Sequence, residues 1–214
     1  MPEKTAQKEP GKKPVPSKKP KPQQEVVVQI SLSELHPFPD HPFQVREDAS
    51  MQETAESVKE YGVLVPALAR PREDGGYELI AGHRRKHACE LAGLATMPVI
   101  VRDIDRDAAT IIMVDSNLQR ENILPSERAK AYKMKMEAIK RQGARTDLTS
   151  PKISAKFRSD DEVGQDAGVS GDTIRNYIAL TQLVPELQQM VDEKKIALLS
   201  LIHISEPTRL LSIS

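Results

Sequence analysis

Apolar and polar residues follow two different patterns along this chain. Short apolar runs, rich in β-branched and aliphatic residues, predict strands at residues 26–32, 63–71, 77–82 and 97–101. Amphipathic segments predict helices at residues 51–61 and 84–92, each followed by a glycine that favours helix termination. The first part of the chain is therefore expected to form a compact α/β unit that ends near residue 115.

Beyond residue 106 the pattern is helical only. Residues 107–122 and 124–143 carry apolar positions at helical spacing, and residues 159–197 predict three short helices. The predicted fold class is therefore α+β, with an α/β domain over residues 27–115 followed by an all-α domain over residues 116–198.

The stretch from about residue 160 to residue 178 has the pattern of a helix-turn-helix. A first helix would end at Ala167, Gly168 would form the turn, and Ser170 or Asp172 would cap a second helix. That second helix begins with small and hydrogen-bonding side chains, the types that recognise base edges in the major groove: Ser170, Gly171, Thr173, Arg175 and Asn176. On spacing alone, an ordinary helical hairpin with a glycine turn is the alternative.

Charges lie in blocks, although the formal net charge of the chain is zero. Net charge is +4 over residues 1–26, −6 over 27–115, +7 over 116–158 and −5 over 159–214. The basic segment 116–158, which includes Lys156, favours contact with DNA, because phosphate contacts supply much of the affinity for nucleic acid. A solvated basic helix face is the other interpretation.

Composition narrows the class of protein. The chain has no Trp, so the core is expected to be aliphatic. A single cysteine, Cys89, excludes an internal disulfide and favours a reducing cytosol. No apolar run approaches the roughly 18 to 20 residues of a membrane span, so a cytoplasmic protein without membrane contact is expected. The Lys- and Pro-rich residues 1–26 are expected to form a disordered tail.

The sequence Gly82-His83-Arg84-Arg85 stands where a predicted strand meets a predicted helix. Free N–H groups at a helix start attract phosphate, and a glycine lets the backbone approach a ligand closely. Two arginines there oppose the helix dipole unless an anion lies between them, so the turn is a candidate phosphate site. The alternative is a pair of exposed arginines paired with nearby carboxylates.

Several ordered blocks resemble the ParB family of chromosome and plasmid partition proteins. They are HPFQVR, SVKEYGVLVPALARP, ELIAGHRRKHACELAGLATMPVIV, SNLQREN and the helix-turn-helix, and they span about residues 27–197. The resemblance implies a sulfiredoxin-like N-terminal fold that binds CTP with Mg²⁺ as a clamp switch, followed by a DNA-binding domain and a dimerisation domain. It also implies a centromere-like palindrome in double-stranded DNA, association with the nucleoid, a homodimer and a partner ATPase.

The resemblance also implies site residues, position by position. The residues that stand at the family's nucleotide-binding positions are Gln44, Arg46, Gly82, His83, Arg84, Arg85 and Asn117. Arg120, just downstream, is expected to contact phosphate or DNA. Ser116 replaces a family glutamate, which removes a carboxylate that would hold Mg²⁺ beside Asn117, so CTP binding is expected to be more robust than any CTPase activity. His83 also replaces a glutamate, a change that the backbone and the arginines are expected to tolerate.

Two other functional classes stay open. A static helix-turn-helix regulator of a plasmid or conjugative element would carry a vestigial nucleotide site, which Ser116 favours. A sulfiredoxin-like reductase would need a cysteine where His83 stands, and a nuclease would need the carboxylates of residues 103–107, which are better explained as a strand end and a helix cap. Residues 199–214 fit neither the helical pattern nor the family, so we expect an artefact or tail there and a missing dimerisation domain.

Overall fold

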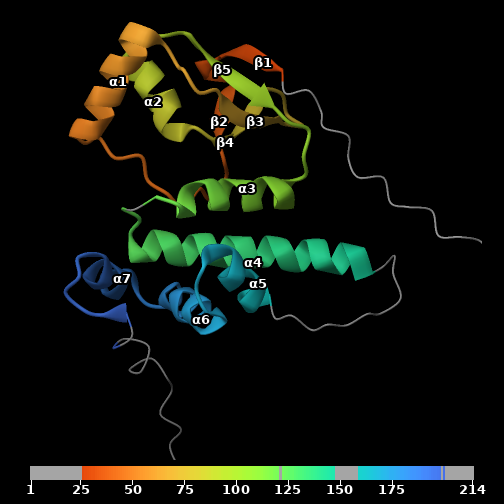
Figure 1. Cartoon of the computed structure of the whole chain (residues 1–214), viewed down its shortest axis with the longest axis vertical. Coiled ribbons are helices and arrows are strands. Elements are labelled where there is room, and N and C mark those ends of the chain that lie inside the picture. The colour runs from red at the N-terminus through yellow and green to blue at the C-terminus, as the bar shows by residue number, and fades with distance from the viewer. Residues whose placement is uncertain (1–25, 121, 148–158, 199, 201–214) are drawn as a thin grey trace, which may run out of the picture.

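The computed structural model describes residues 26–120, 122–147, 159–198 and 200, and in it an α/β layer packs on a stack of helices (Figure 1). The strands are β1 (Val27–Ser31), β2 (Leu35–Pro37), β3 (Ala67–Pro71), β4 (Tyr77–Ala81) and β5 (Thr96–Val101). A 3-10 turn, η1 (Leu32–Glu34), joins the first two. The helices are α1 (Ala49–Tyr61), α2 (His83–Leu91), α3 (Arg106–Leu118), α4 (Pro125–Asp147), α5 (Ser159–Ala167), α6 (Gly171–Leu180) and α7 (Pro185–Asp192).

Three sequence predictions lie outside the described residues. They concern the Lys- and Pro-rich segment up to residue 25, the DNA contact at Lys156 and the tail over residues 199–214 apart from Ser200.

The five strands form one mixed sheet in the order β1-β5-β3-β4-β2. β1 pairs antiparallel with β5, β5 parallel with β3, β3 antiparallel with β4, and β4 parallel with β2. β3 and β4 therefore form a hairpin at the centre of the sheet. It turns at Gly75 and Gly76, which both have positive φ. All of the strands predicted from apolar runs are confirmed, whereas β2 has no such run and was not predicted.

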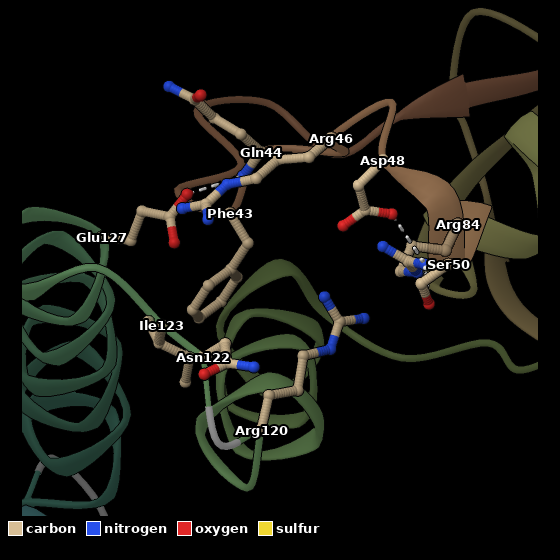
Figure 2. Close-up of a pocket in the computed structure, with 10 residues that line it drawn as sticks. All are labelled: Phe43, Gln44, Arg46, Asp48, Ser50, Arg84, Arg120, Asn122, Ile123 and Glu127. Atoms are coloured by element: carbon tan, nitrogen blue, oxygen red, sulfur yellow. Dashed lines mark hydrogen bonds and ion pairs between the residues drawn. The ribbon is translucent and has the colours of Figure 1, made fainter. Parts of the chain in front are cut away.

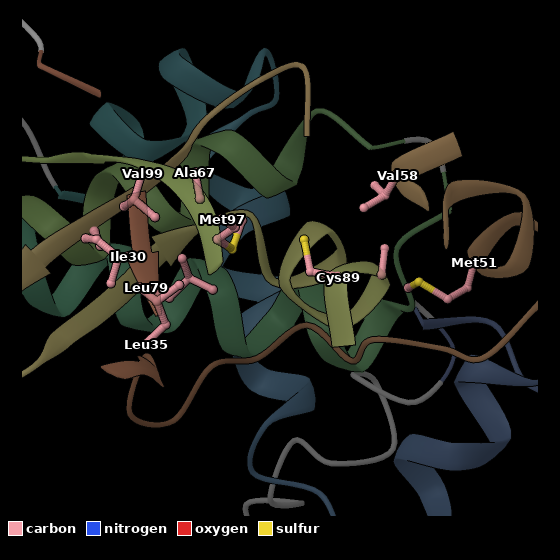
Figure 3. Close-up of a cluster of buried hydrophobic side chains, with 11 residues drawn as sticks. Ile30, Leu35, Met51, Val58, Ala67, Leu79, Cys89, Met97 and Val99 are labelled. Carbon is pink, nitrogen blue, oxygen red and sulfur yellow. The ribbon is translucent and has the colours of Figure 1, made fainter. Parts of the chain in front are cut away.

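One face of the sheet is covered by α1 and α2 (Figure 3). Because side chains alternate along a strand, Ala67 and Ala69 point to this face while Leu68 packs on the other. Met51 from α1 and Cys89 from α2 close the cluster, and both are buried. The buried residues of this cluster are aliphatic or sulfur-containing, whereas two other clusters also bury Phe or Tyr, and Cys89 is a packing residue.

The opposite face of the sheet packs on α3, and α3 in turn packs on α4. Ile80 of β4 joins Met113 and Val114 of α3 and Ala131 of α4 in this second cluster. Phe43, from the loop before α1, is buried in the same cluster. The loop is therefore anchored by an aromatic side chain, which decides where its polar residues lie.

The far side of α4 supports α5, α6 and α7. Tyr132 of α4 contacts Val163 of α5 and Ile174 of α6 in one cluster, while Leu180 and Val191 pack on Ala129 in another. α4 thus lies between the α/β layer and the three short helices (Figure 1). The α+β fold class is confirmed, but the boundary predicted at residue 115 falls inside α3, because that helix continues unbroken to Leu118.

No helix within the described ranges has both the length and the apolar character needed to cross a bilayer.

Candidate functional site

An open cleft lies where the loop before α1, the start of α2 and the α3–α4 connection meet (Figure 2). Its volume is about 460 Å³. The residues that line it are Phe43, Gln44, Arg46, Asp48, Ser50, Arg84, Arg120, Asn122, Ile123 and Glu127. Three of them are arginines and two are carboxylates, so the lining carries more positive than negative charge.

The predicted glycine turn directly precedes Arg84, which lines this cleft. Gly82 is the N-cap of α2 with φ of 113°, and no side chain caps the helix there. By contrast, Asp48 and Asp105 cap α1 and α3 with their carboxylates, each accepting a backbone N–H bond. A Cβ atom at Gly82 would lie 2.8 Å from the Cβ of Ala67, so only glycine lets the turn sit this close to β3.

Arg84 lies in the cleft. Its guanidinium donates to the Ser50 hydroxyl at 3.2 Å and lies 3.8 Å from the Asp48 carboxylate, and its side chain is 29% exposed. At that separation, with Asp48 half exposed, the ion pair is weak. An incoming anion can therefore compete for the guanidinium without breaking a strong contact.

Arg85 lies next to Arg84 in sequence but outside the cleft lining. Its guanidinium donates to the carbonyl oxygens of Val65 and Pro66, at 2.6 and 2.7 Å. Burial lowers the pKa of Arg85. We expected both arginines of the turn to hold an anion. In this structure Arg85 instead fixes the segment that leads into β3, because adjacent residues point in different directions around a helix.

Arg120 was expected among the phosphate or DNA contacts, and the structure places it in the cleft with Arg84 (Figure 2). Burial and then the positive charge of Arg84 lower the pKa of Arg120, while the Glu127 carboxylate raises it. Within the described part of the chain no ion pair holds the Arg120 side chain. It stays charged at neutral pH because an arginine cannot be deprotonated there, so its positive charge faces the cleft.

Gln44 and Arg46 both reach this cleft, as the sequence predicts for residues near a nucleotide. The Gln44 backbone N–H donates to the Glu127 carboxylate at 3.1 Å, which joins the loop to the first turns of α4. A second bond, from the Leu124 N–H to the same carboxylate at 3.2 Å, orients Glu127. The buried Glu127 is therefore a structural bridge that holds two walls of the cleft together.

His83 was expected among the nucleotide contacts but does not line the cleft. Its ring stacks on His41, with centroids 3.9 Å apart. His83 thus contacts the loop through His41 and does not line the cleft. No pattern in the sequence linked His41 to this turn, because the two residues lie far apart along the chain.

Ser116 and Asn117, the expected Mg²⁺ ligands, lie in α3 and do not line the cleft. The Asn117 amide is buried and donates to the Met113 carbonyl at 2.8 Å, and the Ser116 hydroxyl donates to the same oxygen at 2.9 Å. Nor is Asp115 available as a substitute, because it pairs with Lys135 at 2.7 Å. Across the described residues no three His, Cys, Asp or Glu side chains gather as a metal site would need. Within the described residues the Asn117 side chain makes its hydrogen bonds through the amide nitrogen and not the amide oxygen, so the role of Ser116 and Asn117 toward Mg²⁺ stays a prediction.

Two of the three carboxylates considered for a nuclease have structural partners. Asp105 caps α3, as predicted for a helix cap, and Asp107 accepts a hydrogen bond from Arg141 of α4 at 2.7 Å.

The predicted pair of helices is present as α5 and α6, joined by Gly168 with φ of 68°. Ser170 caps α6 by accepting a hydrogen bond from the Thr173 N–H at 3.2 Å, which settles the choice between Ser170 and Asp172. Gly164 is where the helices meet: a Cβ there would lie 2.6 Å from the Val169 carbonyl oxygen. Gly171 is buried against Asp161, so it has a packing role and presents no side chain.

Arg175 is clamped within this pair of helices, which we call the helical hairpin (residues 159–180). Its guanidinium donates to Asp160 of α5 and to Asp172 of α6. These carboxylates raise the pKa of Arg175. Arg175 was predicted to contact DNA, but in this structure its charge is already matched. Of the other predicted DNA contacts, Ser170 is exposed while Thr173 and Asn176 are half-buried.

Several cleft residues were not predicted. Ser50, Asn122 and Glu127 contribute to the lining through their place in the fold, since they come from α1, the α3–α4 connection and α4. Only for Glu127 was there a signal, namely an acidic residue in the first turn of a predicted helix, and that signal indicates capping rather than a site.

Comparison with known proteins gives one consistent picture. Residues 16–118 match the model of the ParB N-terminal domain. The chain is 35% identical over 171 residues to the chromosome-partitioning protein Spo0J of Thermus thermophilus, covering 79% of this chain and 56% of the relative. It is 39% identical over 170 residues to the probable chromosome-partitioning protein ParB of Helicobacter pylori, covering 79% and 52%.

Among solved structures, the fold is similar to the C-terminally truncated chromosome-partitioning protein ParB from Caulobacter crescentus, complexed to the centromeric parS site. The TM-score is 0.53 at 26% sequence identity, and the match covers 80% of each chain. The chain spans about half the length of the curated relatives given above.

Proposed function

Since this chain belongs to the ParB family of partition proteins, we propose that it is a nucleotide-dependent DNA-binding partition protein. In this proposal the cleft holds the triphosphate of CTP, and the helical hairpin approaches a centromere-like DNA site. The Caulobacter relative is described as a complex with its parS site, which supports DNA as the partner. CTP is the nucleotide that the family resemblance implies.

The observation that carries the proposal is the convergence of Arg84 and Arg120 on one cleft beside the uncapped start of α2. The first N–H groups of a helix lack intrahelical partners and attract phosphate oxygens. Arg84 comes from α2 and Arg120 from the end of α3, so a triphosphate between them would join two separate elements. Arg46 adds a third cation from the loop. Such a site suits an extended polyanion better than a single phosphate.

The DNA-binding part of the proposal requires cations outside the helical hairpin. That hairpin carries five acidic residues, namely Asp160, Asp161, Glu162, Asp166 and Asp172, against the single arginine Arg175. Because DNA affinity depends on neutralising phosphates, the basic segment 116–158 would have to supply these contacts. Ser170, Thr173 and Asn176 then remain the proposed base contacts on α6.

Hydrolysis of CTP is not included in the proposal, because Ser116 stands where the family has a glutamate that would hold Mg²⁺. Assembly into a homodimer and engagement of a partner ATPase stay predictions of the family resemblance.

The test is to titrate CTP into the full chain and measure the dissociation constant by calorimetry. Arg84→Ala is expected to weaken binding by about 10- to 100-fold, the value of one charge-assisted hydrogen bond. Lys59→Ala, an exposed lysine in the last turn of α1, is the matched control and should leave the affinity unchanged. Absence of CTP binding, or equal affinity of Arg84→Ala and the native chain, would contradict the proposal.

A second experiment concerns DNA. Binding to a duplex that carries the parS site of the Caulobacter relative is measured with and without CTP. A change in affinity or lifetime on addition of CTP is expected, whereas DNA binding that ignores CTP would favour a static regulator.

A further inference from the structure

Two histidines from distant parts of the chain stack beside the cleft. His41 lies in the loop before α1, and His83 is the first residue of α2. Their ring centroids are 3.9 Å apart with an angle of 42° between the planes. The His41 Nδ1 atom is 2.8 Å from the Phe43 carbonyl oxygen. Because a carbonyl only accepts, Nδ1 of His41 carries the proton and the loop is fixed in a defined turn.

Within the described residues, the Nε2 atom of neither ring has a hydrogen-bond partner. Both Nε2 atoms, those of His41 and His83, are buried. Burial lowers the pKa of both rings, that of His83 to about 3. Each ring is therefore neutral at pH 7, and a proton on either Nε2 would be buried without an acceptor.

The charged groups around the stack also oppose protonation. The charges that lower the pKa of His83 are those of His41, Arg120 and Lys86, in that order after burial. At His41 the charge of Arg120 lowers the pKa and that of Glu127 raises it. His87, Glu90 and Glu47 line the recess on the other side of His83, where His87 lies 3.4 Å from both carboxylates. The carboxylates of Glu47 and Glu90 thus already lie beside the imidazole of His87.

The stack lies at the base of the segment that carries two cleft residues. From His41 the chain runs through the buried Phe43 to Gln44, whose N–H is bonded to Glu127, and on to Arg46. On the other side, His83 directly precedes Arg84. The two rings therefore join the wall that holds Gln44 and Arg46 to the wall that holds Arg84.

We propose that His41 and His83 are a positioning pair: their stacked neutral rings hold residues 41–46 against α2, and protonation of the pair releases this segment and opens the cleft. The pair acts on the ligand through Gln44 and Arg46 and does not contact it. The ligand part of this inference rests on the proposed function, whereas the closed loop itself does not.

The sign of the pH effect follows from the lowered pKa values. The closed form takes up protons less readily than an open form with ordinary histidines, so its stability is fully present above pH 6.5. It is lost progressively as the pH falls below 6.5 towards about 3, the pKa of His83 in the closed form. At pH 5.5 this linkage amounts to about a tenfold shift of the opening equilibrium from His83 alone.

The experiment measures CTP affinity of the full chain at pH 7.5, 6.5 and 5.5. His83→Phe keeps a flat ring on His41 but cannot take up a proton, and His87→Phe is the matched control for loss of a histidine on α2. The native chain and His87→Phe are expected to lose affinity by up to about tenfold more than His83→Phe over this range. Protonation of CTP itself affects all three equally. Equal pH profiles for the native chain and His83→Phe would overturn the inference.

A readout independent of CTP separates this inference from the proposed function. Amide exchange at Gln44, corrected for intrinsic rates, reports the bond to Glu127. Its protection is expected to fall between pH 7.5 and 5.5 in the native chain and to stay constant in His83→Phe. If no variant binds CTP but this difference is present, the nucleotide proposal fails and the positioning pair stands.

A second variant covers the case in which His83→Phe does not fold. His41→Asn keeps a donor for the Phe43 carbonyl but removes the stacked ring, so circular dichroism should match the native chain while Gln44 protection is low at every pH. Native-like protection of Gln44 in His41→Asn would show that the stack does not hold the loop.

Discussion

The cleft and the helical hairpin use arginine in opposite ways. Arg84 and Arg120 face the cleft, where the one ion pair is long and Arg120 has none within the described residues. Arg175 in the hairpin is held between Asp160 and Asp172. An arginine whose charge is matched inside the fold contributes to structure, whereas one that is left unmatched can bind an external anion. This difference supports the cleft as the proposed anion site.

The same contrast separates two adjacent residues of α2. Arg84 has a weak contact with Asp48, while Arg85 makes two short bonds to backbone carbonyls. Sequence position alone would give the two arginines one role. Because their side chains leave the helix in different directions, the two arginines have two different roles.

The largest expected effect is that of Gly82→Ala. The substituted residue would have to adopt positive φ, and its Cβ would collide with Ala67. We therefore expect the free energy of unfolding to fall by roughly 3 kcal/mol. Gly75→Ala is the control, because Gly75 has φ of 89° but nothing within 4 Å of a Cβ. It should cost only roughly 1 to 2 kcal/mol. Urea unfolding measures both, and equal losses would contradict the close approach of the turn to β3.

Arg120→Ala is expected to weaken CTP binding by about 10- to 100-fold, because it removes a cation that faces the cleft and has no ion pair within the described residues. Calorimetry at constant salt measures the change. If Arg120 contacts DNA instead, the variant would keep its CTP affinity and lose DNA affinity. That result would assign Arg120 to DNA binding, one of the two roles that the sequence suggested.

Gly164→Ala tests the hairpin in the same way as Gly82→Ala tests the cleft. Its Cβ would meet backbone atoms of residues 169–171, so roughly 2 kcal/mol of stability should be lost. Because the clash is on the far side of α4 from the cleft, we expect DNA binding to weaken while CTP affinity is retained. Loss of both activities together would show that the two regions do not behave separately.

The smallest effect is expected from Arg175→Ala. It removes two ion pairs at an exposed guanidinium, so thermal stability should decrease slightly and DNA affinity should follow that decrease only. Asp172→Asn is a useful companion, since it removes one pair without removing the arginine. A loss of DNA affinity in Arg175→Ala far beyond its loss of stability would contradict the structural role.

Most elements of the fold could be predicted from local pattern, because period-two runs such as residues 67–71 and helical stripes such as that of α1 are recorded in the sequence itself. β2 could not, since Leu35–Pro37 is too short to show a pattern and pairs with β4 through parallel register. The glycine turn and Arg84 were recognisable from chemistry at a strand-to-helix junction.

The remaining site residues depend on tertiary packing. Arg120 was expected to contact phosphate or DNA from its position just after Asn117, and only the packing of α3 against β4 and α4 brings it to α2. Likewise His41 and His83 meet across a loop that no local pattern closes. The ion pair of Arg175 with Asp160, from the preceding helix, also has no signal in the sequence, and the DNA contact of Arg175 stays a prediction.

The most direct test of the proposed anion site is an NMR titration of the full chain with CTP, followed at backbone amides and arginine Nε–H groups. We predict that the largest shifts occur at residues 82–86 and at Arg120, with little change at residues 170–176. Shifts centred on residues 170–176, or absent from Gly82 and Arg84, would contradict the assignment of the anion site to the cleft.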